Sequence, residues 1–148
     1  MKVVLQRVSE AQLLVNDEQY SVIGIGLVIL LGIEESDGIE DINWLVKKIV
    51  NMRIFADKEG KMNLSLLDVE GELLVVSQFT LHASTKKGNR PSFIKAAKPA
   101  IAIPLYEEFI KRSKIHCTTK TGVFGADMKI ELINDGPVTI ILDSQNRV

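Results

Sequence analysis

The stretch Leu73-Leu74-Val75-Val76-Ser77-Gln78-Phe79-Thr80-Leu81-His82 decides the fold, because four aliphatic residues run directly into hydroxyl, amide and aromatic side chains. An uninterrupted Leu/Val run is typical of a strand covered on both faces. If that strand continues, Ser77 and Phe79 point to one face. Gln78 and Thr80 then point to the other. Open α/β sheets keep their sites at such polar strand ends, although Ser77 and Thr80 could equally end the strand by bonding to local backbone.

Length and composition indicate one globular domain spanning residues 1–148. The chain has 148 residues, of which 46% are hydrophobic and 25% charged, which is ordinary globular composition. A domain of this size buries about two thirds of its unfolded surface without disulfides or metals. The formal net charge of −1 gives no global attraction to nucleic acid, so any RNA contact must come from a local patch. A general nucleic-acid coat protein is therefore disfavoured.

The single cysteine, Cys117, cannot form an internal disulfide, which agrees with a reducing compartment. It follows His116 in a segment that alternates like a strand. Since neighbours on a strand face opposite ways, a buried structural cysteine is favoured over a nucleophile with an adjacent base. The only other histidine is His82, and no CxxC or HxxxH spacing occurs. We therefore expect neither a metal site nor a cofactor.

No targeting or membrane segment is evident in the sequence. Arg7 interrupts the N-terminal apolar run too early for a secretion signal. The longest apolar run, Ile25–Leu31, is too short to span a bilayer. We expect a soluble cytoplasmic protein without membrane contact.

The first part of the chain reads as three strands. Lys2–Val15 is a long first strand with a bend near Ser9, and Asn16–Glu18 closes it with a turn. Tyr20–Ile23 then returns as its hairpin partner. Leu27–Gly32 is fully apolar and fits a central strand.

Helical spacing of apolar residues follows over 38–54, where acidic residues come first and basic residues last. Ser36 or Asp37 is expected to cap this helix. Asp57–Lys61 reads as a turn, and Met62–Asp68 as a short edge element. The helix is expected to pack on the sheet through its apolar stripe.

After the opening stretch, Ala83–Ser92 forms a polar, basic loop and Pro99–Lys114 a second helix. Three closing strands are expected at Ile115–Lys120, Met128–Ile133 and Val138–Leu142. The predicted architecture is one α/β domain with two main helices against a mixed sheet.

Two connections in the last third stand out. Thr121–Met128 carries two glycines around Phe124, so the chain bends sharply and presents the aromatic ring. Asn134–Thr139 contains Asp-Gly and Gly136-Pro137, typical of a tight hairpin turn between two strands. An X-Pro bond in such a turn is also a plausible place for a cis peptide.

The sequence shows no nucleophile with its base. A Ser or Thr hydrolase needs a base beside the nucleophile. On a continuing strand, His82 would lie roughly 7 Å from Thr80, further than a catalytic hydrogen bond reaches. Neither a GxSxG elbow nor a GxGxxG phosphate loop is present. A nucleophilic Thr80 is therefore possible but has no visible base.

Four motifs carry a resemblance to a known family. They are Ser77-Gln78-Phe79-Thr80-Leu81, the segment Lys86–Phe93 that begins Lys-Lys-Gly-Asn-Arg-Pro, Gly125-Ala126-Asp127-Met128 and Asn134-Asp135-Gly136-Pro137-Val138-Thr139. Together with the opening Gln6-Arg7-Val8, they resemble the D-aminoacyl-tRNA deacylase family, formerly called D-tyrosyl-tRNA deacylases, over essentially the whole chain. The resemblance implies a cytoplasmic homodimeric hydrolase with a β/β/α layered fold. It would cleave the ester between a D-amino acid, or glycine mischarged on alanine tRNA, and the terminal adenosine of tRNA.

In that family the Gly-Pro pair, here Gly136-Pro137, is a cis peptide that reaches into the active site of the other subunit. Its carbonyls would collide with the side chain of an L-amino acid, while D-residues and glycine fit. The resemblance thus implies chiral proofreading by steric exclusion.

The same resemblance assigns the remaining site residues. Those lining the pocket for adenosine and ester would be Ser77, Gln78, Phe79 and Thr80. Backbone N–H groups near Phe79 and Thr80 could hold the carbonyl oxygen as charge develops on it. Arg7 would fix the Gly-Pro loop, and Phe124 and Met128 would form pocket wall.

The basic loop supplies a further expectation, which comes from its charges. Lys86, Lys87 and Arg90 are expected to contact phosphates of the tRNA acceptor end, unless they simply form a solvated charged surface. His82 stands where many relatives would have an aromatic residue, so we read it as a wall or surface residue. The alternative function is a non-catalytic RNA-end binding module of the same fold.

Overall fold

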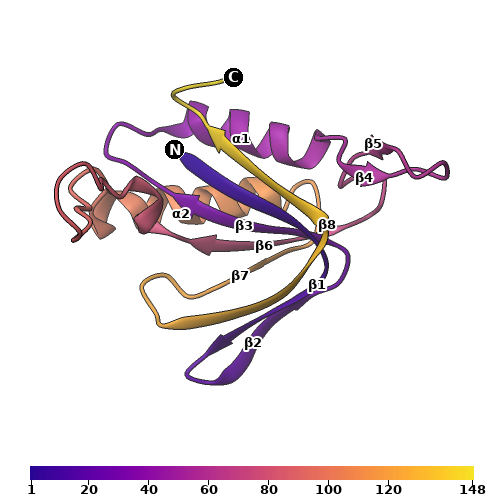
Figure 1. Ribbon diagram of the computed structural model, residues 1–148, viewed down its shortest axis with the longest axis horizontal. Coiled ribbons are helices and arrows are strands. Elements are labelled where there is room, and N and C mark those ends of the chain that lie inside the picture. The colour runs from indigo at the N-terminus through magenta and orange to yellow at the C-terminus, as the bar shows by residue number, and fades with distance from the viewer.

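Two long strands from opposite ends of the sequence run side by side through the molecule (Figure 1). In the computed structural model, which describes residues 1–148, β1 (Lys2–Val15) and β8 (Met128–Asp143) pair antiparallel along almost their whole length. On its other edge, β1 pairs first with β3 (Gly26–Gly32) and then with β2 (Glu18–Ile23), both antiparallel. The expected first strand and its hairpin partner are confirmed.

The opening stretch begins as a central strand. β6 (Glu72–Ser77) lies parallel to β3, and the short β7 (Thr119–Thr121) lies parallel to β6. The sheet is therefore mixed, as expected. Because β3 and β6 are parallel neighbours, Gly32 and Ser77 end them at the same edge of the sheet. β4 (Phe55–Ala56) and β5 (Met62–Leu64) form a separate two-stranded ribbon, so only the start of the expected edge element is a strand.

Two helices, α1 (Ile39–Asn51) and α2 (Pro99–Ser113), pack on one face of the sheet. The largest hydrophobic cluster lies between them and the sheet, with Leu45, Ile49 and Phe109 fully buried. A second, smaller cluster fills the opposite face, where β1 and β2 fold back over β3 and β6. The middle of the sheet thus lies between the helices and its own folded-over half, as Figure 1 shows. No helix in the structure has the length and apolar character needed to cross a membrane.

The cap of α1 differs from the expected one. Gly38 is the N-cap, and its N–H donates to the Asp41 carboxylate at 2.8 Å. Asp37 instead accepts from the N–H of Glu34 at 2.8 Å and from the buried ammonium of Met1. The helix ends at Asn51 rather than 54 because Met52 is extended, with φ −65° and ψ 126°. The second helix agrees with its predicted range to within one residue.

The strand of the opening stretch does not continue past Ser77. The N–H of Gln78 still donates to the carbonyl of Leu31 at 2.8 Å, but Phe79–His82 turns into a 3₁₀ helix, η1. β3 ends one residue after Leu31, so no neighbouring strand remains to pair with these residues. The predicted alternation of side chains beyond Ser77 is therefore wrong.

The predicted hairpin at Gly136-Pro137 is also wrong. β8 runs on through this segment, and Gln6 pairs with Thr139 while Val8 pairs with Asn134. The segment 135–138 thus bulges out of the ladder opposite the single residue Arg7. The Gly136-Pro137 peptide is cis. Such a bulge bends a strand without reversing it.

The third error concerns Ile115–Lys120, of which only the end is a strand. The segment before β7 is a turn, and the N–H of Cys117 donates to the carbonyl of Ser113 at 3.2 Å. Cys117 is half-buried, and this burial raises the pKa of its thiol against the opposing hydrogen bond with Thr119. A thiol with a raised pKa is a poor nucleophile at neutral pH, in line with the structural role expected for Cys117.

Candidate active site

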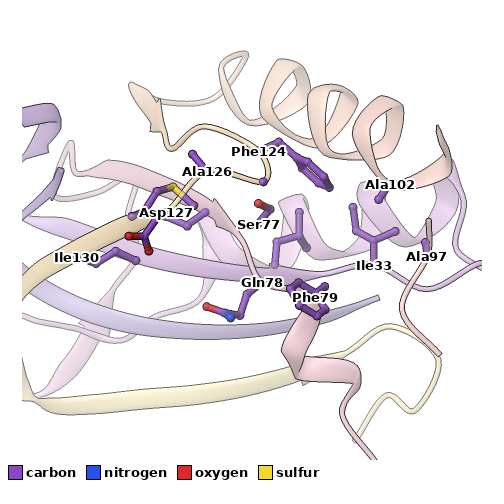
Figure 2. Close-up of a pocket in the computed structure, with 14 residues that line it drawn as sticks. Ile33, Ser77, Gln78, Phe79, Ala97, Ala102, Phe124, Ala126, Asp127 and Ile130 are labelled. Atoms are coloured by element: carbon purple, nitrogen blue, oxygen red, sulfur yellow. The ribbon is translucent and has the colours of Figure 1, made fainter. Parts of the chain in front are cut away.

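A pocket of about 290 Å³ opens where β3 and β6 end (Figure 2). Its walls come from these two strand ends, from the start of α2, and from the loop that leads into β8. The residues lining it are Leu31, Ile33, Val76, Ser77, Gln78, Phe79, Ala97, Ala102, Phe124, Gly125, Ala126, Asp127, Met128 and Ile130. Most are apolar, so the pocket offers an apolar surface with few polar groups to orient a ligand.

Three of the four residues expected from the opening stretch lie in the pocket. Ser77 ends β6, while Gln78 and Phe79 begin the turn that follows. Phe79 is 56% exposed and packs edge-on against Phe93, with ring centroids 5.1 Å apart. An exposed aromatic pair at a pocket mouth is a surface on which a planar group can stack.

Thr80 does not line the pocket. It lies in η1, exposed, and its hydroxyl accepts a hydrogen bond from the Gln78 side-chain amide at 2.5 Å. The 3₁₀ turn carries Thr80 out of the line of β6, which explains why strand alternation misplaced it.

The loop before β8 supplies the wall that the sequence predicted. Phe124 and Met128 both line the pocket, and Gly125 makes the bend with φ +76°. The Phe124 ring lies 5.7 Å from the ring of Tyr106 on α2. The Tyr106 hydroxyl donates to the carbonyl of Val75 at 2.8 Å, and burial raises its pKa to about 12. Tyr106 thus joins α2, the pocket loop and the end of β6.

Asp127 is the only pocket-lining residue with an ionisable side chain. It is exposed, and Figure 2 shows it on the side of the pocket toward Ile130, away from Ala97 and Ala102. Asp127 belongs to one of the deacylase motifs, but the sequence predicted no role for it. One feature of the sequence could have marked Asp127 as a site residue. It follows a Gly-containing bend and precedes the apolar Met128.

Arg7, Gly136 and Pro137 form a second group that does not line this pocket. The buried Arg7 side chain donates from Nε to the carbonyl of Asp135 at 2.9 Å and from Nη1 to the carbonyl of Ile54 at 2.5 Å. Gly136 has φ +131°, and a Cβ there would lie 2.7 Å from Nη2 of Arg7. Pro137 is exposed at the crest of the bulge. Arg7 therefore supports the bulge from below, while Gly136-Pro137 faces outward.

The basic loop lies outside the pocket as well. Lys86, Lys87 and Arg90 are exposed, and none of them makes an ion pair. Two backbone hydrogen bonds between Ser84 and Ser92, of 2.8 and 3.0 Å, close the loop at its base. The three cations are therefore displayed together after η1 and remain free to meet an anion.

His82 is buried, with 4% of its surface exposed, and its Nε2 has no hydrogen-bond partner. The expectation of a surface residue is wrong, because η1 turns the side chain inward beside Gly32. It does not line the pocket. No three His, Cys, Asp or Glu side chains lie close enough together to share a metal ion.

Comparison with known proteins identifies the family. Residues 4–143 match the family model described as D-Tyr-tRNA(Tyr) deacylase. D-aminoacyl-tRNA deacylase of Bacteroides thetaiotaomicron is 61% identical over 99% of both chains. The chain belongs to the D-aminoacyl-tRNA deacylase family. The family member of Flavobacterium psychrophilum is 60% identical, again over 99% of both chains.

Two solved structures share the fold of this chain. The c-Myc DNA Unwinding Element Binding Protein superposes with a TM-score of 0.92 at 41% identity, covering 97% of this chain and 98% of that one. A probable eukaryotic D-amino acid tRNA deacylase superposes with a TM-score of 0.82 at 20% identity, over 95% and 97% of the two chains, which shows a shared fold. The resemblance inferred from the deacylase motifs is confirmed.

Proposed function

We propose that this protein hydrolyses the ester bond of D-aminoacyl-tRNA, releasing the free amino acid and tRNA. Full-length identity of 61% to a D-aminoacyl-tRNA deacylase supports the proposal. The observation that carries it in the structure is the pocket at the ends of β3 and β6, which Ser77, Gln78 and Phe79 line together with Phe124 and Met128. These are residues that the deacylase motifs had selected.

The dimensions and chemistry of the pocket suit an aminoacyl-adenosine. A cavity of about 290 Å³ with apolar walls accepts one amino-acid side chain. The exposed ring of Phe79 then offers a stacking surface for the terminal adenine. The single carboxylate, Asp127, can pair with the α-ammonium of the substrate. Glycine mischarged on alanine tRNA would fit the same site, since it needs less room.

In the proposed reaction, the oxygen of water attacks the ester carbonyl carbon, while the tRNA's own terminal 2′-hydroxyl orients the water and relays its proton. The bond to the ribose oxygen breaks, and that oxygen receives the proton. No histidine lines the pocket, and the Thr80 hydroxyl lies outside it. Catalysis would then rest on positioning and on backbone N–H groups near Phe79 and Thr80, because the first amides of a 3₁₀ turn have no acceptor within the turn.

Chiral selection would require a second copy of the chain. Gly136 and Pro137 point outward and do not line the pocket of their own subunit. In a homodimer they can enter the pocket of the partner and block the side chain of an L-amino acid. Lys86, Lys87 and Arg90, which are exposed and unpaired, would contact phosphates of the acceptor end.

The second candidate is a non-catalytic module that binds the end of an RNA. The structural neighbour with TM-score 0.92 is named as a protein that binds a DNA unwinding element, which supports nucleic-acid binding without turnover as an alternative. Tight binding of a D-aminoacyl-tRNA analogue with no ester cleavage would favour this module.

The test is the release of free amino acid from D-tyrosyl-tRNA compared with L-tyrosyl-tRNA. We expect rapid hydrolysis of the D-ester and loss of the L-ester only at the uncatalysed rate. Hydrolysis of neither ester, or equal hydrolysis of both, would overturn the proposal.

A further inference from the structure

Three cations gather around a tryptophan on the outer side of α1, away from the pocket. Lys48 Nζ lies 5.9 Å and the Arg147 guanidinium 4.7 Å from the centroid of the Trp44 ring. Lys47 lines a hollow beside them together with Trp44 and Lys48. In Figure 1 the C-terminal tail that carries Arg147 ends above α1. We call Trp44, Lys47, Lys48 and Arg147 the Trp44 surface.

Acidic residues are absent from the two hollows at this surface. The first hollow lies over the last turns of α1, and the second lies between α1 and the end of α2. They share Lys47 and Asn51, so they form one continuous surface. Their lining residues are Asn43, Trp44, Val46, Lys47, Lys48, Asn51, Met52, Arg112, Ile115 and His116. None carries a carboxylate, in a chain whose formal net charge is −1.

The cations of the Trp44 surface are also free of ion pairs. Arg112, at the margin of the second hollow, pairs with Glu108 at 2.6 Å. Lys47, Lys48 and Arg147 have no carboxylate within 4.0 Å. Arg147 nevertheless lies close enough to Asp41 to help lower the pKa of that carboxyl, and its Nε donates to the carbonyl of Ser144 at 2.9 Å. The helix macrodipole accounts for a lysine in the last turn of α1. It does not account for Arg147, which reaches the same place from a separate segment and stacks on the ring.

We propose that the Trp44 surface binds the phosphate backbone of the tRNA substrate, as a contact separate from the pocket. The inference rests on the proposed function and names a further part of the substrate's binding site. Cations that form no ion pair within the protein are free to bind phosphates. Asn43 and Asn51 add exposed side-chain amides, which also donate to phosphate and sugar oxygens. The flat ring of Trp44 holds both Lys48 and Arg147 in place through cation–π contacts.

The test compares two double variants that remove the same charge. K47Q/K48Q changes the Trp44 surface, while K58Q/K120Q removes two lysines that are exposed and unpaired elsewhere, after β4 and in β7. Each is assayed with D-tyrosyl-tRNA and with D-tyrosyl-adenosine, which has the ester but no tRNA backbone. For K47Q/K48Q we expect KM for the tRNA substrate to rise about tenfold at low salt. The slope of log KM against log salt concentration should fall by about 2, because each phosphate contact contributes about 0.9 to that slope. Turnover of D-tyrosyl-adenosine should not change.

Each outcome decides the proposal. Equal effects of the two double variants on the tRNA substrate would overturn it, as would loss of D-tyrosyl-adenosine turnover in K47Q/K48Q alone. Binding of deacylated tRNA provides an independent readout and should weaken in K47Q/K48Q and in R147Q but not in the control. If the wild-type protein hydrolyses neither ester, the proposed function fails, and this binding result still decides the role of the surface. Displacement of tRNA by polyglutamate at equal charge would assign the surface to acidic peptides instead.

Discussion

At the scale of single residues, Asp127 is the charged group that the pocket offers to its substrate. We expect Asp127→Asn to raise KM for D-tyrosyl-tRNA about tenfold while kcat stays within about twofold, because a charge-assisted hydrogen bond to the α-ammonium is lost. Steady-state kinetics measure both constants. N-acetyl-D-tyrosyl-tRNA, which lacks the ammonium, is the matched control. Wild type and Asp127→Asn should hydrolyse it equally slowly. A large fall in kcat with KM unchanged would make Asp127 a general base.

Thr80 allows a test of whether the enzyme uses a side-chain nucleophile. Its hydroxyl lies outside the pocket and accepts a hydrogen bond from the Gln78 side-chain amide, with Nε2 and Oγ1 2.5 Å apart. We expect Thr80→Ala to keep kcat within about fivefold of wild type, far from the loss that removing a nucleophile causes. Single-turnover assays with quenching would detect an acyl-enzyme. A trapped acyl-enzyme together with a loss of a thousandfold or more would contradict this mechanism.

The residues that line the pocket were easiest to predict from the sequence where they belonged to a short local motif. Ser77 and Phe79 of the first deacylase motif line the pocket, as does Phe124, which the resemblance to the family assigned to its wall. The sequence could not place Ala97 or Ala102 there, since small apolar residues become pocket walls only through the packing of α2 on the sheet. The roles of the lining residues stay predictions until the variants are assayed.

At the scale of elements, local signals were overridden by partners distant in sequence. Ser36 or Asp37 was expected to cap α1. The Asp37 carboxylate instead accepts hydrogen bonds from the ammonium of Met1 and the N–H of Glu34. The Asp41 carboxylate accepts the hydrogen bond from the N–H of Gly38. Asp-Gly and Gly-Pro signal a turn, yet β8 continues because β1 pairs with it on both sides of the bulge. No window of sequence around residue 136 contains that partner strand. The apolar stripe of α1 was predictable because helical spacing is local.

The Asp41 cap gives a prediction about pH. Burial opposes ionisation of Asp41, but the hydrogen bonds it accepts, including the one from Gly38, prevail and lower its pKa from the ordinary value of 3.8. The folded state therefore favours the carboxylate, and this stabilisation is present above about pH 4 and is lost as the pH falls through the lowered pKa. We expect Asp41→Asn to reduce the free energy of unfolding by about 1 kcal/mol at pH 7.

Urea unfolding at several pH values measures this difference. The gap between wild type and Asp41→Asn should close as the pH drops from 4 toward 2. Glu40→Gln, at an exposed neighbouring position in the first turn, controls for loss of a charge near the helix N-terminus. A gap that is constant with pH would show that the charge of Asp41 contributes nothing.

At the scale of the whole molecule, the proposed homodimer would complete a site of which one chain holds only a part. The pocket and the Gly136-Pro137 bulge are separate, and only the pocket residues lie together. Since Gly136 has φ +131° and an added Cβ would lie 2.7 Å from Nη2 of Arg7, Gly136→Ala must shift the bulge or Arg7 beneath it. We expect this variant to hydrolyse L-tyrosyl-tRNA at least about tenfold faster than wild type, because the steric block to L-side chains is displaced. Activity on D-tyrosyl-tRNA should be largely kept.

Subunit mixing then tests whether the bulge acts in trans. Ser77→Trp fills the pocket but leaves the bulge intact, so a heterodimer with Gly136→Ala has one open pocket that faces an intact bulge. Mixing the two variants should therefore lower the L-tyrosyl-tRNA hydrolysis of Gly136→Ala. The matched control mixes wild type with the double variant Ser77→Trp/Gly136→Ala, in which the open pocket of the heterodimer faces the altered bulge and L-hydrolysis should rise. If each bulge instead acts on its own pocket, mixing would leave the L-hydrolysis of each Gly136→Ala chain unchanged and the control mixture would show no rise. That result would rule out selection in trans.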